Sequence, residues 1–235
     1  MAISDLESPV LGVKRTLFRM HDPAREEADE AFRTIRKSVL ARDKNTCRFC
    51  RMATAPSEAR PSGYFQVHHL DNNHKNNTMG NLATVCPFCH QVFHAGMAGH
   101  GKEPGLAIFL PELGQWELNR LCHVIFAVLS SKSEDLSEEK TKAERLYHEL
   151  QERNKTLKDV FGPEAASLAS LAKAIARLPE ALYVKRDIAL ADVRILPIRG
   201  AFIPETEYWS ELLLKKIPVR LWDGILDAKI AQKKD

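Results

Sequence analysis

Apolar residues recur at helical spacing in the segment before the first pair of cysteines. Between residues 24 and 41, Phe32, Ile35 and Val39 lie three or four positions apart, acidic side chains come early and basic ones come late. This spacing puts the apolar residues on one face of a helix, and the order of charges suits the helix dipole. The pattern predicts a helix over residues 24–41, after an apolar stretch at 10–18 that favours a strand or an extended arm.

Short elements follow in the part of the chain that is rich in cysteine and histidine. After a loop with proline and glycine, residues 64–67 have the composition of a short strand, and this strand leads into a pair of histidines. The asparagine-rich residues 71–80 predict a polar loop. Residues 81–85 then lead into the second cysteine pair, and residues 90–94 predict the opening of a helix.

The second half of the chain has the spacing of helices. Residues 113–129 are apolar around most of a helical circumference, which predicts a buried helix. The charged residues 132–159 keep an apolar stripe, and Asp135 with Glu138 could form a capping box. We expect Gly162 and the following proline to end this helix. Beyond it the pattern predicts Ala-rich helical sequence to residue 177, an irregular stretch to 204 and two short amphipathic helices ending near 232.

Length and composition fit a globular protein with its own core. The chain has 235 residues, of which 44% are apolar and 28% charged, and these fractions exclude fibrous and wholly disordered classes. The longest apolar run, residues 124–129, is far shorter than the ~18 residues that span a bilayer. The first residues include Asp5 and Glu7 and lack the apolar core of a secretory signal. We therefore predict a cytoplasmic protein with no transmembrane insertion.

Four of the five cysteines form two Cys-x-x-Cys pairs, Cys47 with Cys50 and Cys86 with Cys89, and Cys122 stands apart. Residues i and i+3 of a tight turn direct two thiolates at one point, and two such turns supply the four-sulfur set that zinc prefers. A disulfide competes poorly because thiols stay reduced in the cytoplasm. We favour a structural zinc ion on these four cysteines, and redox-active dithiols or unligated core cysteines are the alternatives.

Histidines gather around the second cysteine pair. Residues 67–94 read VHHLDNNHKNNTMGNLATVCPFCHQVFH, in which a histidine pair precedes Asn-Leu and then Cys-x-x-Cys-His-x-x-x-His. This sequence resembles the HNH nucleases, over residues 47–94. The resemblance implies a ββα-metal module of the treble-clef type held by zinc. With the helices expected elsewhere packed on this module, the predicted fold class is α+β and predominantly helical.

The HNH resemblance also implies a role for individual residues. His69 aligns with the general base that activates water against a phosphodiester, and Asn81 aligns with the asparagine that holds the loop and orients that base. His68, His90 and His94 align with the ligands of a catalytic divalent cation, which could be Mg²⁺, Mn²⁺, Ni²⁺ or Zn²⁺.

The same histidines also have a structural interpretation. His68 and His69 can be packing or capping residues beside the zinc site, and His90 can stabilise the cysteine turn through a backbone carbonyl. The net charge of +3 neither indicates nor excludes a nucleic-acid partner. We expect three parts: an arm and helix at 1–41, the HNH-like zinc module at 42–101, and a helical region at 102–235 packed with the module as one domain.

Three segments point to a narrower family. RKSVLARDKNTCRFC at residues 36–50, GLAIFLPELGQWELNRLCHVIFAVLS at 105–130 and ILPIRGAFIPETEYW at 195–209 look like the DotN (IcmJ) family of type IVB secretion systems. The resemblance implies an HNH-like zinc protein that works without catalysis. Such a protein docks on the C-terminal tail of the coupling ATPase beside other adaptors, supports the recruitment of secreted substrates, and is recruited from the cytoplasm to the inner-membrane secretion complex.

Two hypotheses of different classes follow. The first, which we favour, is a zinc-stabilised adaptor that binds a partner peptide through an exposed apolar surface of the helical region. The match outside the zinc motif supports it. The second is an active metal-dependent HNH endonuclease with DNA as its partner, and it is supported by the complete set formed by His68, His69, Asn81, His90 and His94.

Overall fold

The computed structural model describes Leu11, residues 25–95 and residues 104–216. Helices dominate these residues and two small antiparallel sheets accompany them, so the α+β class predicted from sequence is confirmed. Apart from Leu11, the predicted arm lies outside the described residues, as does the second of the two amphipathic helices expected at the C-terminal end. Among the described helices, none has the length and apolar character needed to cross a membrane.

The described elements mix short strands and helices as far as α3, and α3 to α8 then follow one another with no strand between them. The α-helices are α1 (Arg25–Arg42), α2 (Pro87–Phe93), α3 (Gln115–Leu129), α4 (Ser137–Glu152), α5 (Asn154–Phe161), α6 (Leu168–Ala176), α7 (Glu180–Tyr183), α8 (Arg186–Ala189) and α9 (Ile203–Lys216). The strands are β1 (Gln66–His69), β2 (Leu82–Val85), β3 (Gly105–Phe109) and β4 (Val193–Pro197). Single 3-10 turns are η3 (Met79–Asn81), η5 (Glu134–Leu136), η6 (Pro163–Ala166) and η7 (Arg199–Ala201).

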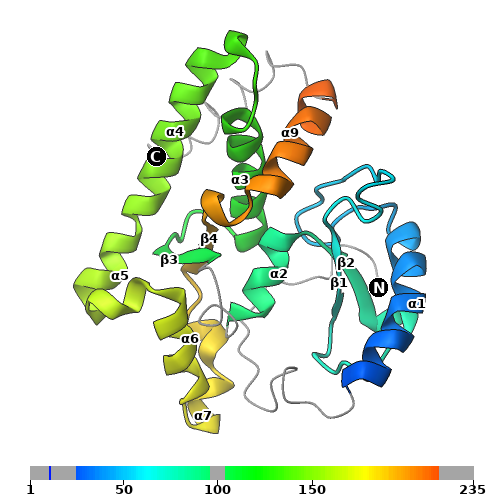
Figure 1. The fold of residues 1–235 in the computed structure, drawn as a ribbon. Helices are drawn as coiled ribbons and strands as arrows, with labels where there is room; N and C mark the ends of the chain where they lie inside the picture. The colour runs from blue at the N-terminus through cyan, green and yellow to red at the C-terminus, as the bar shows by residue number, and fades with distance from the viewer. Residues whose placement is uncertain (1–10, 12–24, 96–103, 217–235) are drawn as a thin grey trace.

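Helix α1 and the β1–β2 hairpin form one side of the molecule, as Figure 1 shows, with α2 between them and the remaining helices. The end of α1 is tied to β2: Arg42 donates to the Leu82 carbonyl at 2.7 Å, and the Thr84 N–H donates to the Asp43 carboxylate at 2.9 Å. In the hairpin, His68 lies opposite Ala83. These bonds fix how α1 sits against the strands.

Two predicted boundaries in this region are wrong by a few residues. Strand β1 begins at Gln66 and contains the histidine pair, instead of ending before it. Helix α2 begins at Pro87 and ends at Phe93, so it encloses His90 and does not open there. Proline suits the first position of a helix, because the N–H that it lacks would have no partner there. The helix therefore begins at Pro87.

The charged segment forms two helices where one was predicted. The chain turns between α4 and α5, where two hydrogen bonds tie it to β3. The Arg153 carbonyl accepts from the Phe109 N–H at 3.3 Å, and the Asn154 side chain donates to the Ala107 carbonyl at 2.7 Å. The predicted capping box is also wrong. Leu136, the last residue of the η5 turn, occupies the N-cap position of α4, and no side chain caps the helix.

The sheet of β3 and β4 was not predicted. It pairs Gly105 with Pro197 and Phe109 with Val193, positions more than eighty residues apart in sequence. Each strand is short, and β4 lies within the stretch that the pattern marks as irregular. Both segments take their hydrogen bonds from partners distant in sequence, above all from each other, so neither is recognisable alone.

One hydrophobic cluster joins the hairpin side to the helices. It contains residues from α1, both cysteine turns, α3, α4 and α9, among them Val39, Phe65, Phe88, Phe126, Leu146 and Trp209. Trp209 of α9 is 1% exposed, and its indole donates to the Gly63 carbonyl at 3.1 Å. Its ring packs edge-on against Phe65 and Phe88. Trp209 therefore anchors α9 to the loop before β1.

Replacing Trp209 should test this anchor. We expect Trp209→Ala to lower the free energy of unfolding by about 3–5 kcal/mol, because it leaves a large cavity in the shared core. Urea denaturation followed by circular dichroism measures the change. Ile203→Ala, at a 46% exposed position of the same helix, is the matched control and should change stability by less than about 0.5 kcal/mol. Equal stability of the two variants would contradict the anchor.

Candidate metal centre

The first cysteine pair lies in a tight turn after α1. The Cys47 N–H donates to the Met52 carbonyl at 2.8 Å, the Arg51 N–H donates back to the Cys47 carbonyl at 3.1 Å, and Thr46 bridges Ala53. Arg51 has a φ of 68°, the left-handed conformation that reverses the chain. The turn thus presents the side chains of Cys47 and Cys50 on one side.

The second pair lies at the start of α2. Cys86 is the N-cap residue, and both Cys89 and His90 donate their backbone N–H groups to the Cys86 carbonyl, at 3.1 and 2.9 Å. One helical turn separates the two cysteines, so their side chains point the same way. Strand β2 ends directly before this turn and holds it against the hairpin.

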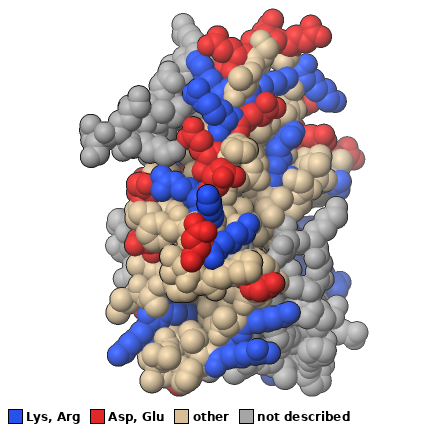
Figure 2. All heavy atoms as spheres, turned by 90° about the vertical axis from the view of Figure 1, so that its left-hand side faces the viewer, with Lys and Arg blue, Asp and Glu red and all other residues tan. Residues whose placement is uncertain are grey.

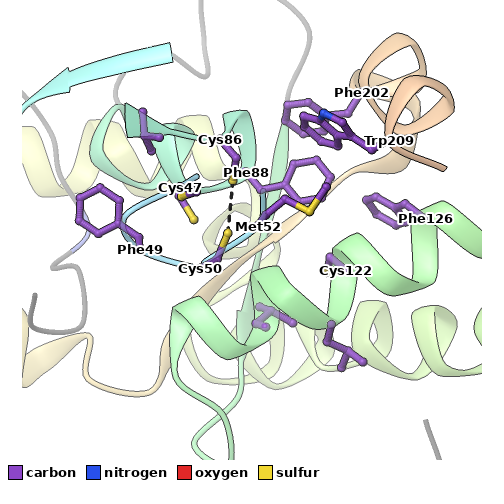
Figure 3. Close-up of a cluster of buried hydrophobic side chains, with 14 of the residues drawn as sticks. Cys47, Phe49, Cys50, Met52, Cys86, Phe88, Cys122, Phe126, Phe202 and Trp209 are labelled. Carbon is purple, nitrogen blue, oxygen red and sulfur yellow. Dashed lines mark hydrogen bonds between the residues drawn. The ribbon is translucent and has the colours of Figure 1, made fainter. Parts of the chain in front are cut away.

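The two turns bring four sulfur atoms together inside the core. All four cysteines are fully buried, and their Sγ atoms lie within 4.8 Å of one another. The Sγ atoms of Cys50 and Cys86 are 3.6 Å apart, the contact drawn in Figure 3. Aromatic side chains surround the group. Four thiols that converge in this way could hold a metal ion, as the sequence spacing predicts.

The local electrostatics differ among the four cysteines. Burial alone would raise the pKa of Cys50, but hydrogen bonds from the three other cysteines and from His123 outweigh it and hold that pKa well below its ordinary value. Burial raises the pKa of Cys86 and of Cys89. Without a cation, then, the group does not favour four thiolates, and a divalent cation would supply the missing positive charge.

Helix α3 contributes two donors that the sequence analysis missed. The Asn119 side chain donates to Cys89 Sγ at 3.2 Å, and His123 Nε2 lies 3.4 Å from Cys86 Sγ and 3.7 Å from Cys50 Sγ. Both residues are buried. His123 lies outside the segment that resembles the HNH nucleases. A signal was present in the sequence: Gln115, Asn119 and His123 are polar residues four positions apart on one face of a helix that is apolar around most of its circumference.

A second group of possible ligands lies on the α2 face of the hairpin. Nitrogen atoms of His68, His90 and His94 lie within 4.8 Å of one another. The His68 ring stacks on Phe93 with centroids 4.2 Å apart. Burial lowers the pKa of His68 to about 3, and repulsion from His94 adds to this effect, so the imidazole is neutral at physiological pH. The structure thus brings together the three histidines that the sequence suggested as cation ligands.

His69 does not join that group. Successive residues of a strand point to opposite faces, and the His69 ring lies near Phe32 of α1, with centroids 5.0 Å apart. His69 Nε2 is 2.9 Å from the Asn77 Oδ1. A carbonyl oxygen can only accept, so Nε2 carries the proton and Nδ1 is the basic nitrogen. The side chain is only 5% exposed, which restricts the access of water.

Asn81 holds the loop between the strands. Its amide donates to the Asn76 carbonyl at 2.8 Å and to Asp71 Oδ1 at 2.9 Å, and its Oδ1 accepts from the Asp71 N–H at 3.1 Å. The loop that Asn81 closes carries Asn77, the partner of His69. Asn81 therefore contacts the loop that carries Asn77 and makes no direct bond to the His69 ring in this structure.

Comparison with known proteins gives one clear relationship. The chain is 31% identical over 192 residues to the type 4 apparatus protein DotN of Legionella pneumophila subsp. pneumophila. The aligned residues make up 80% of this chain and 84% of that protein. No protein-family model matches the chain. The extent of the alignment means that the similarity includes the helical part of the chain and is not limited to the cysteine and histidine motifs.

Removing one cysteine tests the metal centre. We expect Cys47→Ser to lose bound metal and most of its folded structure, since a four-cysteine metal site contributes folding energy directly. Elemental analysis of the purified protein and a thermal melt give the two measurements. Cys122→Ser, a fully buried cysteine outside the cluster, is the control and should keep its metal. A Cys47→Ser protein with wild-type metal content and melting temperature would contradict the site.

Proposed function

The chain belongs to the DotN family of type 4 apparatus proteins, and we propose that it is a cytoplasmic adaptor of a type IVB secretion coupling complex. In this role it binds the C-terminal tail of the coupling ATPase next to other adaptors and supports substrate recruitment at the inner membrane. The alignment with DotN carries the proposal, because it covers 84% of that protein and continues through the helices. A protein that shared only a metal-binding motif with DotN would not align with it over so much of its length.

We propose zinc as the metal of the four-cysteine site. Four thiolates without an open position are the ligand set typical of structural zinc. The cysteine turn after α1, the β1–β2 hairpin and the start of α2 have the order of an HNH-like, treble-clef module over residues 42–101. Residues 102–235 would pack on it as one domain, and the hydrophobic cluster shared between the described parts supports this arrangement.

The surface of α7 and α8 is the docking site we favour. Leu182, Val184 and Ile188 are 55%, 58% and 75% exposed, although they are large aliphatic side chains within seven residues of one another. In Figure 2 the charged side chains in the lower part of the visible face, where Figure 1 places α6 and α7, are mainly basic. Residues 168–189 carry four basic side chains and two acidic ones.

The combination of aliphatic residues and positive charge defines the occupant. An apolar surface bordered by lysine and arginine fits a peptide with alternating apolar and acidic residues, since apolar contacts supply affinity and charges supply orientation. We therefore propose that the tail of the coupling ATPase binds here through a segment of that composition. Tyr183 stiffens the surface, because the Arg186 guanidinium lies 4.1 Å from its ring centroid.

Charge introduced on this surface should weaken the complex. We expect Leu182→Asp and Ile188→Asp each to lower the affinity for a synthetic tail peptide about tenfold or more, which corresponds to about 1.4 kcal/mol per residue. Isothermal titration calorimetry gives the affinity. Ile203→Asp, at an exposed aliphatic position on α9, is the control and should bind like wild type. Unchanged affinity in both surface variants would exclude α7 and α8 as the docking site.

A DNA endonuclease is the second candidate function, and the histidine geometry favours it. His68, His90 and His94 converge as ligands for a divalent cation of the Mg²⁺, Mn²⁺, Ni²⁺ or Zn²⁺ type. His69 would act as general base through Nδ1, with Asn81 keeping the loop in place. The burial of His69 beneath Phe32 is the feature that argues against this function, since a general base must reach its water.

Plasmid cleavage separates the two functions. If the protein is a nuclease, wild type should cleave supercoiled DNA with Mg²⁺, Mn²⁺ or Ni²⁺, and His69→Ala should lose this activity while keeping its zinc and its fold. His148→Ala, an exposed histidine on α4, controls for contaminating nuclease. For the adaptor that we favour, all three proteins should be equally inactive. Cleavage by wild type and His148→Ala, but not by His69→Ala, would establish the enzyme.

A further inference from the structure

We propose that Gln115, Asn119 and His123 form a stripe of hydrogen-bonding side chains on α3 that serves as the outer shell of the metal centre and, through Gln115 and Asn119, links it to the β3–β4 sheet. This inference rests on the metal centre of the proposed function and goes beyond it. It assigns a role to α3, which lies outside the HNH-like module. The three residues are four positions apart, so they share one face of the helix.

The stripe begins at β4. Gln115 Nε2 donates to the Ile195 carbonyl at 2.9 Å, and Gln115 Oε1 accepts from the Ile195 N–H at 2.8 Å. This pair of bonds fixes which way the Gln115 amide faces, because a backbone N–H can only donate and a backbone carbonyl can only accept. The remaining hydrogen of Gln115 Nε2 is directed at Asn119 Oδ1, 3.0 Å away.

The orientation of the Asn119 amide follows from that of Gln115. Its Oδ1 is occupied by the bond from Gln115, and so its Nδ2 is the atom that faces Cys89 Sγ, at 3.2 Å. Asn119 is fully buried. An amide in such a place is costly unless its groups are paired, and a metal-bound thiolate is a stronger acceptor than a neutral thiol. The bond is therefore strongest when the metal is present.

His123 completes the stripe, and its surroundings define its tautomer. Nε2 faces the sulfur atoms of Cys86 and Cys50, whereas Nδ1 is buried without a hydrogen-bond partner. A buried N–H with no acceptor is worse than a buried lone pair, so the proton of the neutral ring belongs on Nε2. The ring is held by Phe88, stacked at 4.3 Å, and by Trp209, edge-on at 5.1 Å.

The consequence is that metal and helical region stabilise each other. Hydrogen bonds to thiolates lower their charge density and hold their positions, and outer-shell partners of this kind change metal affinity by about 10–100-fold when removed. In the other direction, loss of the metal frees the sulfur atoms that it holds opposite two buried donors. The helix that carries them, and the β4 strand bonded to Gln115, should then loosen.

The direct test uses the full chain with ¹¹³Cd in place of zinc. We expect two-dimensional ¹H–¹¹³Cd spectra to show coupling from the His123 Nε2–H and from the Asn119 side-chain amide, transmitted across the N–H to sulfur bonds. The ¹⁵N shifts of His123 should show the proton on Nε2. A cadmium-loaded protein that shows neither coupling, or that has the His123 proton on Nδ1, would overturn the stripe.

Two variants test the effect on metal retention. His123→Phe keeps the stacked ring and Asn119→Leu keeps the volume, and both remove the donor. We expect zinc release to a competing chelator to be about tenfold faster or more in each. Cys122→Ala, on the same helix and buried, controls for the loss of packing alone and should release zinc at the wild-type rate. Wild-type release rates in both donor variants would overturn the proposal.

The outcomes separate this inference from the function on which it rests. Purified wild type without bound metal would overturn both. A protein that holds zinc, shows neither coupling and still binds the tail peptide would overturn the stripe alone. A protein with both couplings that does not bind the peptide would overturn the adaptor function and leave the stripe intact.

Discussion

Four buried cysteines impose the constraint on which the rest of this structure depends. Their sulfur atoms converge at the centre of the main hydrophobic cluster, where a thiolate has no water to solvate it. Such a group is stable only when a cation balances its charge and donors surround it. The turn after α1 and the first turn of α2 supply the sulfur atoms, and α3 supplies the donors. Because these elements come from separate parts of the chain, their assembly sets the fold.

The candidate metal centre and the core cannot be treated as separate features. Phe88 lies between the two cysteines of α2 in sequence, and its ring contacts His123, Phe126 and Trp209. The residues that close the metal site are thus also those that pack α3 and α9. A small hairpin with one short helix has little core of its own. Here the helices of the second half complete that core.

The histidines of the hairpin and α2 can serve packing as well as chemistry. The three histidines on the α2 face converge as possible metal ligands, while His69 on the other face is covered by α1. Possible ligands can also serve in packing: His68 stacks on Phe93 as a core aromatic residue would. The exposed aliphatic residues of α7 and α8 are the opposite case, since they lie largely outside the core and form the docking surface proposed above.

The sequence by itself determined the local features of this protein. The Cys-x-x-Cys spacing, the apolar periodicity of α1 and α3 and the order of histidines and asparagine each depend on residues that are near one another, and the structure brought the four cysteines and the three histidines together. Only the tertiary structure decided the rest. The β3–β4 pairing, the break between α4 and α5 at Arg153 and the approach of Asn119 and His123 to the sulfur atoms all depend on partners distant in sequence. Local periodicity carries no information about such partners, because a polar group in a helix looks the same whether it meets water or a thiolate.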